Sequence, residues 1–168
     1  MVECQKCLDP TSLGLFLVAV VSLPLAILQL VGIDGVYGVP TEQFFILLGL
    51  MIIAVAYFAY KADANFGFVV FALVGAAVTM TGLGMGSYEN ITFALVFVLA
   101  IGWSIFAKTP KNLTLILVTT ALIFLFVGLS GLVDGDYWHW LIGIAALFNF
   151  IFNIYLAYAL ATEKFPVF

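Results

Sequence analysis

Residues 43–60 read QFFILLGLMIIAVAYFAY, an apolar run without a charged side chain, and Lys61 follows it directly. A helix needs about 20 such residues to cross the hydrocarbon core of a bilayer. In lipid the backbone of a spanning segment must satisfy its own hydrogen bonds, which a helix does. This stretch therefore predicts a transmembrane helix.

Five further segments have the same apolar character, and turn-forming residues separate them. The first of them is too long for the apolar region of a signal peptide, so we expect it to remain as a span. The predicted fold is an all-α integral membrane protein with six transmembrane helices in residues 12–163, between short cytoplasmic tails at 1–11 and 164–168. The predicted spans are residues 12–32, 43–60, 66–83, 91–107, 113–133 and 137–161.

The composition excludes several classes of protein. Of 168 residues, 65% are hydrophobic and 8% are charged, whereas a soluble domain has roughly 45–50% apolar and about 25% charged residues. Five Lys and no Arg make nucleic acid an implausible partner. No ionisable residue lies deep in a span, which argues against the charged relay of a pump. There is no nucleophile–base pair and no phosphate loop, so we expect no enzyme, no cofactor and no metal.

The lysines orient the predicted spans. Lys6, Lys61, Lys108, Lys111 and Lys164 all fall on one side of the membrane. Positive residues favour the cytoplasmic side, which places both termini in the cytoplasm and the protein in the inner (plasma) membrane. The opposite loops contain no Lys and hold the acidic residues Asp34, Glu42, Glu89, Asp134 and Asp136.

Cys4 and Cys7 form a C-x-x-C pair in the N-terminal tail. A structural zinc site needs four ligands, so we expect two ordinary thiols in a reducing compartment, with a metal shared between subunits as the alternative.

A weak internal repeat accompanies the spans. LGLF at 13–16, FGFV at 66–69 and NLTL at 112–115 each open a span at the cytoplasmic face. The pattern favours three parallel helical hairpins around a central path, because parallel repeats commonly place a solute path at their axis.

The last span carries two neutral polar residues, Asn149 and Asn153. They are four residues apart and therefore share one helix face. They can line a solute path, or they can hydrogen-bond neighbouring helices as packing contacts.

Residues 9–15 (Asp9, Pro10, Thr11, Ser12, Leu13, Gly14, Leu15) open the first span. They are similar to the N-P-A-P-L-G-L signature of the acetate uptake transporter family, and further motifs follow in the order of that family. Asn65, Phe66, Gly67 and the later Phe71 resemble its N-T-F-G-x-x-x-F motif, and residues 106–108 and 154–157 add weaker matches. Asp9 replaces the signature Asn, and Ser12 replaces its second Pro.

This resemblance implies a six-helix subunit, a homohexamer, and a path through each subunit for acetate and sometimes succinate. It also implies a constriction formed by the first, third and fifth spans. The corresponding positions here are Val18, Val74 and Thr120. All three are smaller than the side chains that the resemblance leads us to expect there, which would leave a wider or less apolar neck.

The expected function is therefore a channel-like or proton-linked path for small monocarboxylates, acetate first and succinate second. One alternative is a channel for neutral solutes such as urea or amides, which the DGDYW run at 134–138 resembles locally. Another is a structural membrane protein without transport. The acidic outer loops would repel an anion, unless the acid crosses in its protonated form.

Overall fold

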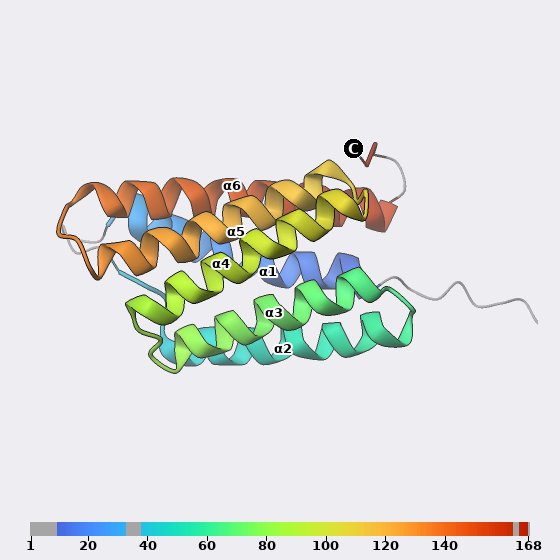
Figure 1. Ribbon diagram of the computed structural model, residues 1–168, viewed down its shortest axis with the longest axis horizontal. Helices are drawn as coiled ribbons and strands as arrows, with labels where there is room; N and C mark the ends of the chain where they lie inside the picture. Colours follow the sequence, from blue (N-terminus) through green and yellow to red (C-terminus); the bar gives the residue numbers. More distant parts are fainter. Residues whose placement is uncertain (1–9, 33–37, 163–164, 168) are drawn as a thin grey trace, which may run out of the picture.

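The computed structural model describes residues 10–32, 38–162 and 165–167. Within these residues the secondary structure is entirely helical (Figure 1). All six helices are long and apolar enough to cross a membrane, which confirms the predicted fold class. The helices are α1 (Pro10–Leu30), α2 (Glu42–Lys61), α3 (Asn65–Gly82), α4 (Ser87–Phe106), α5 (Lys111–Ser130) and α6 (Tyr137–Thr162).

The helix ends lie close to the predicted span ends, and the largest difference at a helix start is at α4. This helix begins at Ser87 rather than at residue 91. The residue before it, Gly86, has an extended backbone and permits a sharp entry into the helix. The polar first turn, including Asn90, therefore extends the helix beyond the apolar segment.

Three helices end in the same hydrogen-bonded turn. After α2, α3 and α4 the chain passes through a left-handed residue, namely Asp63 (φ 56°), Gly84 (φ 89°) and Lys108 (φ 53°). In each case the next main-chain N–H donates to the carbonyl five residues earlier, for example Ala64 to Ala59 at 3.0 Å. This is the Schellman arrangement, which satisfies carbonyls left over at a helix end. It allows short connections between antiparallel neighbours.

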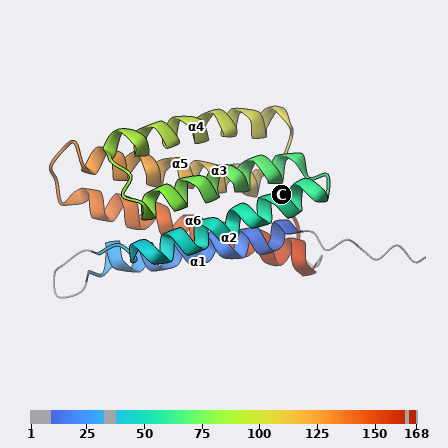
Figure 2. The ribbon, with the colours of Figure 1, turned by 90° about the horizontal axis from the view of Figure 1, so that it is seen from below.

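The helices pack most closely in three antiparallel pairs, α2 with α3, α4 with α5, and α1 with α6 (Figures 1 and 2). These pairs differ from the hairpins expected from the repeat, which join α1 to α2, α3 to α4 and α5 to α6. The pairs α2–α3 and α4–α5 are joined at the end of the bundle that carries Lys61, Lys108 and Lys111, here called the lysine end. The opposite end, called the acidic end, carries Glu42, Glu89, Asp134 and Asp136.

Glycines explain why α2 pairs with α3. A Cβ atom built on Gly75 would lie 2.8 Å from the carbonyl oxygen of Gly49, and one built on Gly49 would lie 2.9 Å from that of Gly75. The two backbones therefore touch where neither has a side chain. A Cβ atom built on Gly128 of α5 would likewise lie 2.8 Å from the carbonyl oxygen of Ser87 on α4. Close backbone approach through small residues is how helices associate in lipid.

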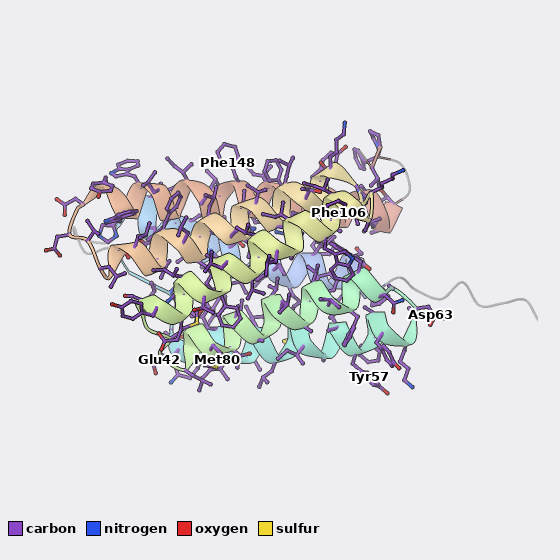
Figure 3. All side chains as sticks on the ribbon, viewed as in Figure 1. Glu42, Tyr57, Asp63, Met80, Phe106 and Phe148 are labelled. Carbon is purple, nitrogen blue, oxygen red and sulfur yellow. The ribbon has the colours of Figure 1, made fainter. Side chains whose placement is uncertain are left out.

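Large apolar side chains cover the outside of the bundle. Tyr57, Met80, Phe106 and Phe148 point away from it (Figure 3) and are exposed. In water such a surface would aggregate, whereas lipid chains solvate it. Together with the six helices, this surface makes the chain a multi-pass membrane protein.

Candidate functional site

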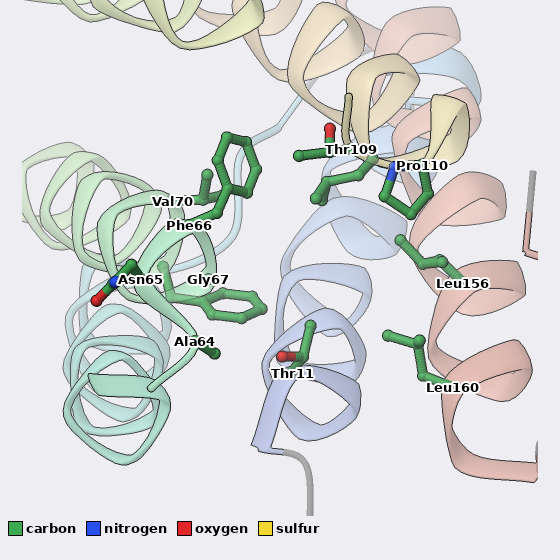
Figure 4. A pocket seen from close by; sticks show the side chains of 12 residues that line it. Thr11, Ala64, Asn65, Phe66, Gly67, Val70, Thr109, Pro110, Leu156 and Leu160 are labelled. Atoms are coloured by element: carbon green, nitrogen blue, oxygen red, sulfur yellow. The ribbon is translucent and has the colours of Figure 1, made fainter. Parts of the chain in front are cut away.

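A cavity of about 360 Å³ opens at the lysine end, among α1, α3, α6 and the turn between α4 and α5 (Figure 4). Three residues of the second family motif, Asn65, Phe66 and Gly67, line it near its mouth, and Phe71 lies one turn deeper. Its wall is otherwise almost entirely apolar. The remaining lining residues are Thr11, Ala64, Val70, Thr109, Pro110, Leu113, Leu156 and Leu160.

A second cavity, of about 240 Å³, lies toward the acidic end. The three residues expected at the constriction, Val18, Val74 and Thr120, all line it, from α1, α3 and α5 respectively. The structure thus brings together three positions that are far apart in sequence. Asn149 of α6 joins them, and Glu42 at the start of α2 is the one ionisable residue in the described lining.

An apolar layer lies between the two cavities. Leu15 of α1, Phe71 of α3 and Leu117 of α5 each come three residues before the expected constriction residue on the same helix. They belong to one buried cluster, and their exposed fractions are 1%, 2% and 0%. Phe71 reaches the lysine-end cavity, whereas Leu15 and Leu117 line neither cavity. This buried layer separates the two cavities.

Asn149 is the centre of a buried hydrogen-bond network. Its Nδ2 donates to Thr119 Oγ1 at 2.9 Å and to Thr120 Oγ1 at 2.8 Å, and lies 3.2 Å from the carbonyl oxygen of Ile116. Its Oδ1 accepts a hydrogen bond of 2.7 Å from Ser22 of α1. The network therefore ties α1, α5 and α6 together at the depth of the expected constriction.

Asn149 both lines a cavity and bonds neighbouring helices, so the two interpretations of the sequence are not exclusive. Asn153 behaves differently, because it does not line either cavity. Its Nδ2 donates to Oδ1 and O of Asn149, at 2.9 and 2.8 Å. Its Oδ1 is buried without a partner among the described residues, as is Nδ2 of Asn112. Asn153 thus helps to hold the side chain of Asn149 in place through a hydrogen bond to its Oδ1.

The first family motif contributes mainly to packing. Pro10 is the first residue of α1, where its missing N–H costs nothing. Leu13 faces outward, whereas Gly14 lies directly against the ring of Phe71. Asp9, Cys4 and Cys7 lie outside the described residues.

Some lining residues were not among the expected site residues. Asn90 and Thr81 line the acidic-end cavity, but the sequence placed Asn90 before the fourth span. Ser22 of α1 also lines it. The signal that all three share is a polar side chain within an otherwise apolar helix. Nothing in the pattern separated Leu117 from lipid-facing leucines.

The chain resembles a solved structure over nearly its full length. That structure, described as the bacterial acetate channel SatP, superposes with a TM-score of 0.79 and covers 95% of this chain and 98% of that chain. The sequences are 13% identical, so the likeness establishes a shared six-helix fold. No family model matches the chain, and a search of curated proteins found no similar sequence.

Proposed function

We propose that the protein is a channel for small monocarboxylates, with acetate as the principal solute and succinate as a second one. The observation that carries this proposal is the pair of cavities that approach one apolar layer from opposite ends of a membrane bundle. The bundle has the fold of an acetate channel. A solute that crosses the bundle meets two sets of side chains. One is the layer of Leu15, Phe71 and Leu117, and the other is the ring of Val18, Val74 and Thr120 around the acidic-end cavity.

The size and wall of the cavities suit a small solute. Volumes of about 360 and 240 Å³ hold a molecule the size of acetate with a few waters. The walls offer few polar groups, so a solute would lose part of its hydration shell on entry. An apolar layer that closes the path gates flow by excluding water, as hydrophobic constrictions do in channels.

Uptake of labelled acetate and labelled urea into proteoliposomes, measured side by side, tests the proposal. Acetate should enter faster than in protein-free vesicles. Leu117→Ala should raise acetate flux severalfold by thinning the apolar layer. The matched control is Leu115→Ala, since Leu115 lies on the same helix at similar depth but is 38% exposed to the lipid side. Urea uptake without acetate uptake would favour the neutral-solute alternative, and no uptake of either would favour a structural role.

We further propose that the lysine end faces the cytoplasm and that the assembly is a homohexamer. The lysine distribution supports the orientation, and the family resemblance supports the hexamer. Native mass spectrometry in mild detergent tests the assembly, and a stable monomer as the sole species would contradict it.

A further inference from the structure

The hydroxyl groups that line the acidic-end cavity have no hydrogen to offer a solute. Thr81 and Thr120 each donate to the carbonyl oxygen four residues earlier on their own helix, at 2.9 and 2.8 Å. Ser22 has two acceptors for its single hydrogen, a carbonyl of its own helix at 2.9 Å and Oδ1 of Asn149 at 2.7 Å. A hydroxyl that donates inside the protein still has lone pairs to accept with. Toward the cavity these residues are therefore acceptors.

The N–H groups of the two side-chain amides in the cavity, those of Asn149 and Asn90, also donate within the protein. Nδ2 of Asn149 has two hydrogens and faces three oxygens, two of them the hydroxyls of Thr119 and Thr120. Nδ2 of Asn90 faces two carbonyl oxygens, the nearer being that of Gly86 at 2.8 Å. Turning either amide over would set its oxygen against those oxygens, which fixes both orientations. Oδ1 of Asn90 accepts no hydrogen bond from the described residues.

Deep in the cavity, neither the main chain nor a charged side chain supplies the missing donors. The deep wall comes from helix interiors, where each N–H is bonded to a carbonyl four residues earlier. The described lining contains no Lys or His, and its one ionisable group is the carboxylate of Glu42 at the mouth of the cavity. A solute deep in this cavity therefore meets spare acceptors, and the negative charge of Glu42 lies at the mouth.

We propose that the acidic-end cavity selects small uncharged solutes that donate hydrogen bonds. The protein would then conduct undissociated acetic acid and its amide isostere, acetamide, and exclude the acetate anion. A carboxylate only accepts hydrogen bonds, whereas the undissociated acid donates one and an amide donates two. Moving an unpaired carboxylate into an apolar cavity is also very costly. The assignment of the acid rests on the proposed monocarboxylate function, while the amide activity goes beyond it.

The pH dependence distinguishes the two solutes. A small carboxylic acid with a pKa of about 4.3 loses about tenfold of its undissociated form for each pH unit above that value. At constant total acetate, influx through the protein should fall by that factor. Acetamide does not titrate in this range, so its influx should stay constant.

Competition in proteoliposomes tests the selectivity directly. Influx of labelled acetate is measured in mildly acidic buffer, with the rate of protein-free vesicles subtracted, in the presence of acetamide or acetone. Acetone has the same number of non-hydrogen atoms as acetamide but no donor. Acetamide should compete, acetone should not, and stopped-flow light scattering should show acetamide entry through the protein.

Two matched variants distinguish the effect of the Thr120 hydroxyl in the cavity from its effect on the hydrogen-bond network of Asn149. Thr120→Val keeps the shape of the side chain and removes one acceptor from the cavity, while both hydrogens of Asn149 Nδ2 keep the acceptors Thr119 Oγ1 and Ile116 O. Thr119→Val removes a bond to the same amide from a residue that does not line the cavity. The acetamide concentration that halves acetate influx should rise about two- to tenfold more in Thr120→Val than in Thr119→Val, which is the effect expected for the loss of one hydrogen bond.

The outcomes separate this inference from the proposed function. Acetate influx that is independent of pH, with acetone competing as well as acetamide, would overturn the donor selectivity while the acetate channel stands. Acetamide entry without acetate influx at any pH would uphold the selectivity of the cavity and overturn the monocarboxylate function. Entry of neither solute would overturn both.

Discussion

Gly14 and Phe71 form a contact that a single methyl group should disturb. A Cβ atom on Gly14 would lie 2.5 Å from both Cε1 and Cζ of Phe71 and 2.9 Å from Cδ1. Favourable contacts between carbon atoms lie at about 3.5–4.0 Å. In Gly14→Ala the ring of Phe71 must therefore move by about 1 Å. Because that ring is 2% exposed, most directions are blocked by packed neighbours.

The structure leaves one direction open, because Phe71 borders the lysine-end cavity. The ring can tilt into it, so we expect Gly14→Ala to cost about 1–3 kcal/mol of unfolding free energy, the usual range for overpacking. Truncation, as in Phe71→Ala, should cost more, about 3–5 kcal/mol. The tilted ring also narrows the approach to the apolar layer, so acetate influx should fall in Gly14→Ala.

A double-mutant cycle measures this contact. Unfolding free energies in mild detergent would be compared for the parent protein, Gly14→Ala, Phe71→Leu and the double variant. Leu is shorter than Phe, so the added methyl group should cost little in its presence, and the coupling should fall in the range of about 0.5–3 kcal/mol seen for residues in contact. Additive costs would show that Phe71 is not the group that the methyl meets, and would refute the reasoning.

The control is Gly102→Ala on α4. A Cβ atom there has no neighbour within 4 Å in the subunit. It should be neutral or raise the unfolding free energy by up to about 1 kcal/mol, since Ala favours the helix over Gly. If Gly102→Ala lowered the unfolding free energy as much as Gly14→Ala, the cost would come from replacing a helical glycine and not from the contact with Phe71.

Three further predictions concern the neck, a helix pair and the orientation. Val18→Phe with Val74→Tyr should narrow the ring around the acidic-end cavity and slow succinate more than acetate, because packed protein yields little to a larger solute; an unchanged uptake ratio in a correctly assembled variant would exclude these positions from the selective neck. Gly49→Ala should destabilise the protein by about 1–3 kcal/mol in thermal unfolding, because its Cβ would meet main-chain atoms of α3 at 2.6 and 2.9 Å, and a neutral result would mean that the two helices separate freely. Cys4 and Cys7 should resist an impermeant maleimide in intact cells and react after lysis, whereas prompt labelling of intact cells would reverse the proposed orientation.

The class of fold and the number of spans could be predicted from the apolar runs of the sequence. Long uncharged apolar runs can exist only as helices in lipid, so the elements followed without tertiary information. Their ends were less certain where polar residues such as Asn90 extend a helix past its apolar segment. The family resemblance pointed to Val18, Val74 and Thr120, on the three spans that begin alike in the repeat, and the structure brings these residues to one cavity.

The pairing of the helices, the side chains of the apolar layer and the direction of the polar groups could be seen only once the helices were packed together. In a membrane protein both the core and the lipid face are apolar, so Leu117 and Leu115 look alike in sequence although one is fully buried and the other is 38% exposed. The direction of each hydrogen bond depends on partners far away in the chain, as Ser22 and Asn149 show across 127 residues. For that reason the sequence could show that polar groups lie within the spans, but not that they face the acidic-end cavity as acceptors.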